Sequence, residues 1–144
     1  SATLDYENKI EFDYVDLDEA FPPCDPGFAP SGSAIMVQIR TAKKKTKGGI
    51  ILVDDVRETE IWNTQIGKVI GIGPVAFRNR NTMELWPEGA WYSIGDFIRV
   101  PKYGGDRWTV PTADGQGQAI IALFNDLDSK AVATGDPTKI KAFL

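Results

Sequence analysis

The sequence contains no histidine and only one cysteine among its 144 residues. Without histidine there is no imidazole to act as a general base, to activate a serine or cysteine nucleophile, or to ligate a metal. The single cysteine, Cys24, excludes an internal disulfide and any cluster of cysteine ligands. We therefore expect no catalytic residues, no cofactor and no metal site, and a carboxylate-based enzyme is the catalytic class left open.

Long apolar segments are also absent. No run reaches the roughly 18 residues that a membrane-spanning helix needs, and the start of the chain lacks a signal-peptide pattern. The length and the 42% hydrophobic content suit one compact domain with appendages. Together with the lone cysteine, these features predict an intracellular protein that has no membrane partner.

Charge is distributed unevenly along the chain. Residues 1–25 contain eight acidic residues and one lysine, whereas the remaining residues contain twelve acidic and fifteen basic residues. The net charge of −4 argues against nucleic acid as the main partner. Residues 1–30 are predicted to form an acidic N-terminal arm that ends in a proline-rich linker. This arm is either a disordered tail or a segment lying across a neighbouring subunit, and its aromatic residues favour the second.

Short β-branched segments recur after the linker. Strands are predicted over residues 33–40, 67–72, 97–100, 107–110 and 119–124, with glycine-bearing turns between them. Residues 78–88 are polar and are predicted to form a long loop or a hairpin tip. Many short strands with little helix indicate an all-β fold, a small barrel or sandwich.

The end of the chain and the tryptophans carry weaker signals. Asp136 followed by Pro137 suits the start of a short C-terminal helix, with Ile140, Phe143 and Leu144 on one face. The four tryptophans stand beside predicted turns and loops. We interpret them as caps of the barrel and edges of its core.

The stretch over residues 41–53 differs from all other parts of the chain. Four lysines lie between residues 43 and 47, and Gly48 and Gly49 then precede the apolar triplet Ile50, Ile51 and Leu52. Adjacent like charges and paired glycines predict a mobile loop. The triplet must be buried, either in this protein's own core or in a groove of a partner.

Taken in order, these segments resemble the GroES-like co-chaperonin family. The resemblance covers residues 33 to about 124, roughly two-thirds of the chain. It is carried by the opening strand, the charged loop closing on G-G-I-x-L at 48–52, G-x-V-x-x-x-G-P at 67–74, I-G-D-x-I at 94–98, the Y-G-G turn at 103–105 and the last apolar strand. The long insert around residues 78–88 resembles versions encoded by bacteriophages.

The resemblance implies an irregular β-barrel over residues 31–124 that assembles into a homo-oligomeric ring, heptameric in the family. It also implies that Ile50, Ile51 and Leu52 bind a nucleotide-bound host chaperonin, with Gly48 and Gly49 as the hinge of the loop. Such a protein assists folding in the host cytoplasm without chemistry of its own.

The chain departs from the family pattern at both ends. The acidic arm over residues 1–30 is additional, and the extension over residues 125–144 is longer than the family's closing segment. An alternative therefore stays open: a virion structural protein that decorates a capsid, with the major capsid protein as its partner. The first hypothesis predicts an exposed triplet in the free protein, and the alternative predicts a buried one.

Overall fold

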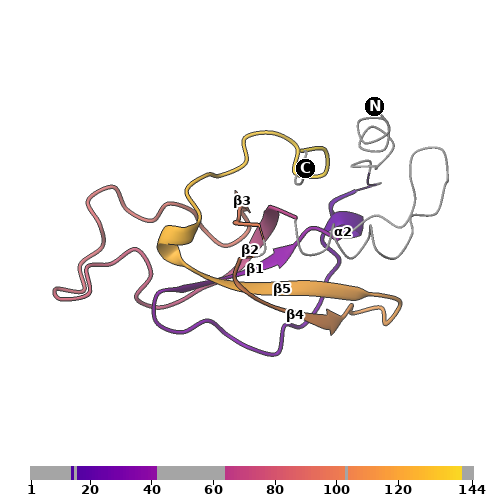
Figure 1. Cartoon of the computed structure of the whole chain (residues 1–144), viewed down its shortest axis with the longest axis horizontal. Helices are drawn as coiled ribbons and strands as arrows, with labels where there is room; N and C mark the ends of the chain where they lie inside the picture. Colours follow the sequence, from indigo (N-terminus) through magenta and orange to yellow (C-terminus); the bar gives the residue numbers. More distant parts are fainter. Residues whose placement is uncertain (1–13, 15, 42–63, 103, 141–144) are drawn as a thin grey trace.

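The computed structural model describes residues 14, 16–41, 64–102 and 104–140, and these residues form a fold composed mainly of strands and loops (Figure 1). In chain order the elements are α2 (Leu17–Ala20), β1 (Ala34–Ile39), β2 (Ile66–Ile72), β3 (Phe97–Arg99), β4 (Asp106–Pro111), β5 (Gln118–Asn125) and the 3-10 helix η1 (Asp126–Asp128). The predicted all-β fold class is confirmed. Each of the five strands overlaps one of the predicted segments.

All five strands belong to one antiparallel sheet in the order β3-β2-β1-β5-β4. β1 is the central strand, and Ile39 at its end faces Gly67 of β2 on one side and Ile120 of β5 on the other. A bulge interrupts the β1–β2 register between Met36 and Val37. Bulges increase the local twist of a sheet, which helps this one to curl around a core.

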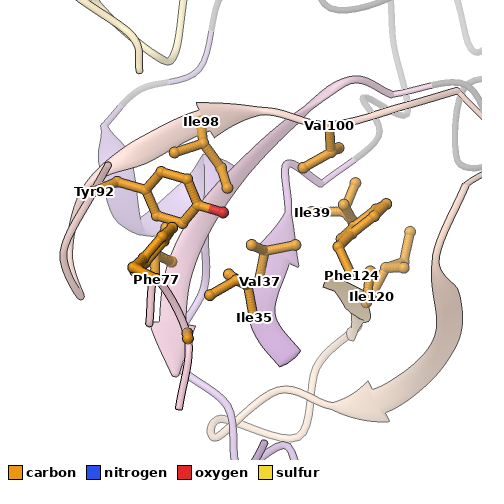
Figure 2. Close-up of a cluster of buried hydrophobic side chains, with 12 residues drawn as sticks. Ile35, Val37, Ile39, Phe77, Tyr92, Ile98, Val100, Ile120 and Phe124 are labelled. Atoms are coloured by element: carbon orange, nitrogen blue, oxygen red, sulfur yellow. The ribbon is translucent and has the colours of Figure 1, made fainter. Parts of the chain in front are cut away.

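The core lies inside the curl of the sheet (Figure 2). Alternate residues of a strand point to one face of a sheet, and in β1 and β5 those that face the core are mostly branched aliphatics or aromatics. The insert between β2 and β3 supplies further aromatic side chains to the same cluster. The labelled core residues are Ile35, Val37, Ile39, Phe77, Tyr92, Ile98, Val100, Ile120 and Phe124.

A half-buried arginine links the edge strand β4 to the chain beside β2 and β3. Arg107 of β4 donates hydrogen bonds to the carbonyl oxygens of Gly104 at 2.8 Å and Pro101 at 3.0 Å, and more distantly to that of Thr64 at 3.4 Å. Burial lowers the pKa of Arg107, and its guanidinium lies over the ring of Phe124. These side-chain hydrogen bonds link β4 to the segment before β2 and to the segment after β3. The barrel is irregular here because side-chain bonds stand where a regular barrel has bonds between strand backbones.

The described part of the N-terminal arm packs on this chain's own sheet. The amide of Gln38 donates to the carbonyl oxygen of Pro22 at 2.7 Å, and Cys24 pairs with Thr112 beyond the end of β4. Phe21 is buried and packs against Phe97. The described residues 16–30 therefore pack on the outside of this chain's own barrel. The interpretation of the arm as a segment lying across a neighbouring subunit stays a prediction.

The arm also contains a helix that was not predicted. α2 is a single turn, and Asp16 caps it by accepting a hydrogen bond from the Glu19 amide at 2.9 Å. An aspartate three residues before a glutamate is a start signal for a helix. The signal is present in the sequence, but the proline-rich linker that follows it favoured an extended chain.

The C-terminal segment runs back over the sheet from η1 towards the side on which α2 lies (Figure 1). It covers the free edge of β3, where Val132 pairs with Ile98 and the amide of Ala133 donates to the carbonyl oxygen of Phe97 at 2.7 Å. Asp136 caps a turn over residues 137–139, as the predicted N-cap requires. The rest of the predicted helix, residues 141–144, lies outside the described residues.

The insert between β2 and β3 is a hairpin with an anchored base. Arg78 pairs with Leu85, in agreement with the hairpin tip predicted over residues 78–88. At its base, the buried amide of Phe77 donates to a carboxylate oxygen of Asp126 at 2.9 Å. The loops of this insert project from the side of the sheet opposite to α2 (Figure 1).

Two of the four tryptophans lie at the edge of the core, as predicted. Trp86 and Trp91 pack against the core, with Trp86 edge-on to Phe77 at 5.6 Å between ring centroids. Trp108 packs against an aromatic residue of the arm. The fourth, Trp62, lies outside the described residues.

Candidate functional site

The predicted binding loop is flanked by two described segments, which we call its roots. The first root is residues 40–41, before the loop, and the second is residues 64–65, before β2. Gly48, Gly49, Ile50, Ile51 and Leu52 all lie outside the described residues. The chain is described up to residue 41 and again from residue 64. The geometry of these two roots is what the structure contributes to the site.

The two roots are neighbours on the sheet. The predicted loop, residues 41–53, begins directly after β1, and the chain is described again at residue 64, directly before β2; β1 and β2 are paired antiparallel strands. The amide of Arg40 donates to the carbonyl oxygen of Ile66 at 3.1 Å, directly between the two roots. The intervening residues therefore start and finish at one end of the barrel, at adjacent strand ends.

The first root is held by the arm. The amide of Thr41 donates to the carbonyl oxygen of Ala20 at 2.8 Å, and the hydroxyl of Tyr14 donates to the carbonyl oxygen of Thr41. Ala20 is fully buried and Tyr14 nearly so. The backbone just before the loop is thus fixed on both its donor and its acceptor side.

A buried arginine forms the second support of the first root. Arg40 is only 1% exposed, and its Nη1 donates to the carbonyl oxygens of Pro137 at 3.1 Å and Ile140 at 2.5 Å. Its guanidinium lies over the ring of Tyr14, 5.4 Å from the centroid. Hydrogen bonds from a charged donor to backbone carbonyls are stronger than neutral ones, so this contact is stabilising.

The second root is held by the barrel itself. Thr64 is only 2% exposed, and its carbonyl oxygen faces the guanidinium of Arg107. The next residue, Gln65, accepts a hydrogen bond from the amide of Val100 at 2.9 Å. The chain is therefore fixed by contacts to buried residues at residues 40–41, before the predicted loop, and again at residues 64–65, before β2.

The described residues do not form a catalytic or metal centre. Among them, no group of three or more carboxylate, cysteine or histidine side chains could hold a metal ion. Burial, and secondarily the charge of Asp25, raises the pKa of the Cys24 thiol, which disfavours a reactive thiolate. None of the helices described in the structure is long and apolar enough to cross a membrane.

Sequence reasoning missed the residues that fix the roots. Arg40 ends an apolar strand and Arg107 begins a short one, and a charged residue at a strand end is ordinarily solvated. Their carbonyl partners lie far along the chain, up to 100 residues away for Arg40. The one signal in the sequence that could have indicated these contacts is a charged residue directly next to an apolar run.

A family model described as the chaperonin 10 Kd subunit matches residues 27–118. The match spans more than half of the chain and includes β1 to β4, the predicted loop and both of its roots. It leaves out most of the arm and all of the C-terminal segment beyond β5. The chain therefore belongs to the chaperonin 10 Kd subunit family.

Proposed function

We propose that the protein caps a nucleotide-bound chaperonin ring by docking Ile50, Ile51 and Leu52 of each subunit into apolar grooves of the chaperonin. One observation carries the proposal: the loop's two roots lie at adjacent strand ends and are held by buried contacts. Such roots would hold the start of the loop at one end of the barrel. Gly48 and Gly49 would serve as its hinge.

Membership of the family supplies the general part of this function. Its members are non-enzymatic, ring-forming partners of a chaperonin, and this protein is a co-chaperonin in that general sense. The finer features are part of the proposal: a heptameric ring, a bacteriophage-encoded type and a host chaperonin in the host cytoplasm. The long hairpin insert supports the bacteriophage type.

The physical chemistry of such a loop suits a reversible cap. A segment that becomes ordered on binding loses conformational entropy, so each copy binds weakly. A ring presents several copies at once, and the effective concentration then makes the whole contact tight. The four lysines before the triplet would steer the loop towards an acidic partner surface.

Co-sedimentation with the host chaperonin, with and without ATP, tests the proposal. The decisive variant is Ile50→Ser/Ile51→Ser/Leu52→Ser. Each fully buried aliphatic side chain contributes about 1.5–3 kcal/mol, so three serines should abolish nucleotide-dependent binding. The wild-type protein should bind only with nucleotide.

The chain offers a matched control for the loss of apolar surface. Leu85, Ile94 and Leu127 are exposed aliphatic residues of the described barrel, with Ile94 65% exposed. Replacing these three by serine should leave binding unchanged. Failure of a well-folded wild-type protein to bind would refute the cap and redirect attention to binding to a major capsid protein, the alternative that the extensions suggested.

A further inference from the structure

The C-terminal segment reaches the first root of the loop through one side chain. Arg40, directly before the loop, donates to the carbonyl oxygens of Pro137 and Ile140. These acceptors lie 97 and 100 residues further along the chain, beyond the part that the family model matches. The contact therefore joins a residue inside the matched range to a segment outside it.

The turn that contains these carbonyl groups is stabilised by the side chain of Asp136. A carboxylate oxygen of Asp136 accepts from the amide of Thr138 at 2.9 Å and from its hydroxyl at 2.7 Å. The amide of Ile140 donates a hydrogen bond to the carbonyl oxygen of Asp136 at 3.1 Å. Asp136 thus fixes the backbone on which both acceptors of Arg40 lie, although its own side chain is exposed to solvent.

We propose that Arg40 is a positioning residue through which the C-terminal segment fixes the start of the binding loop and thereby sets the affinity for the chaperonin. This inference rests on the proposed function for its last step. Its structural step concerns Thr41, whose amide is bonded to Ala20 and whose carbonyl oxygen is bonded to Tyr14. Arg40 stacks on that same tyrosine, so the arm and the C-terminal segment meet at the loop's first residue.

Fixing the root matters because loop ordering opposes binding. Each residue whose backbone is already ordered in the free protein need not be ordered when the loop docks. The freedom of one residue corresponds to on the order of tenfold in an equilibrium constant. In a ring of several subunits the effect is repeated in every copy.

Amide hydrogen exchange followed by NMR tests the structural step, with the Thr41 amide as the probe. In Arg40→Met, which keeps an unbranched apolar stem, exchange at Thr41 should rise on the order of tenfold. In Asp136→Ala it should rise as well, although the substitution is far from Thr41 in sequence. The Val37 amide, in the middle of β1, should keep its protection in both variants.

Asp114→Ala is the matched control. Asp114 also accepts a threonine hydroxyl, from Thr112 at 2.7 Å, and a backbone amide at 2.9 Å, but in the turn between β4 and β5. This variant should leave Thr41 unchanged. Unchanged exchange at Thr41 in Asp136→Ala, or an equal rise in Asp114→Ala, would overturn the positioning role.

Binding to the host chaperonin with ATP tests the last step. Arg40→Met and Asp136→Ala should bind on the order of tenfold more weakly than Asp114→Ala and the wild-type protein. Equal binding by variants with a loosened Thr41 would overturn the link to affinity. No binding by the wild-type protein would refute the proposed function, and the exchange result would then decide on the positioning role by itself.

Discussion

Phe77 offers a test in which glycine should be better than alanine. The residue is 1% exposed and adopts a φ of 62°, in the left-handed region that side chains disfavour. Its ring is the centre of the insert's aromatic cluster, 5.0 Å from Tyr92 in an edge-on arrangement. The contacts of the ring thus hold a backbone conformation that is unfavourable by itself.

Two opposing terms decide the comparison. Both Phe77→Ala and Phe77→Gly lose the buried ring, which costs about 3–5 kcal/mol in the free energy of unfolding. The alanine variant keeps the left-handed strain of about 1–2 kcal/mol, whereas glycine does not. Glycine loses about 0.5–1 kcal/mol through its freedom in the unfolded chain. Phe77→Gly should therefore be more stable than Phe77→Ala, by up to about 1 kcal/mol.

Urea unfolding followed by tryptophan fluorescence measures the difference, because Trp86 and Trp91 belong to the same cluster. The neighbouring residue Ala76 provides the control, since it is buried and its φ is not positive. There, Ala76→Gly should be less stable than the wild-type protein by about 1 kcal/mol. A Phe77→Gly variant that unfolds at lower urea than Phe77→Ala would refute the assignment of backbone strain to this position.

Three further substitutions should each change the stability of the protein in a direction that the structure predicts. Gly73→Ala should cost at least about 3 kcal/mol, measured by urea unfolding, because its Cβ would lie 2.3 Å from the carbonyl oxygen of Gly32. Burial, and then the nearby carboxylates, raise the pKa of Tyr92, whose hydroxyl donates to the carbonyl oxygen of Asp126. The stability from this neutral phenol is complete below pH about 10 and is lost as the pH rises further, so Tyr92→Phe should flatten the alkaline side of a stability–pH profile. A threonine hydroxyl and a backbone amide in its turn lower the pKa of Asp136. Its contribution is complete above pH about 3.9 and is lost as the pH falls through the lowered pKa, so Asp136→Ala should flatten the acid side.

The strands could be predicted because each one carries its own signal. Residues 119–124 form an apolar run that lies in β5 (Gln118–Asn125). The predicted strand over residues 67–72 ends directly before Gly73, as β2 does. Burial of one face imposes the alternation, so the pattern is a local consequence of the core. The match to the family model then confirms the family that the order of these segments suggested.

The contacts at the loop's roots could not be predicted, because they join distant parts of the chain. Nothing near Arg40 in the sequence indicates that its acceptors lie at Pro137 and Ile140. The contacts of the arm could not be predicted for the same reason: Phe21 and the carbonyl of Pro22 have their partners on distant parts of the same chain. The assignment of the triplet and the hinge glycines stays a prediction, since those residues lie outside the described ranges.

The two roots of the loop differ in what holds them, and this difference assigns separate roles to the barrel and its extensions. Arg107 and the Val100 amide hold the second root from within the part that the family model matches. Tyr14, Ala20 and Arg40 hold the first root, and the partners they bring belong to the arm and the C-terminal segment. A change in either extension should therefore reach the loop through β1 and leave the β2 side fixed. The pairing of β1 and β2 in the barrel brings the two roots together. The two extensions control how well the backbone is ordered at Thr41, where the loop begins.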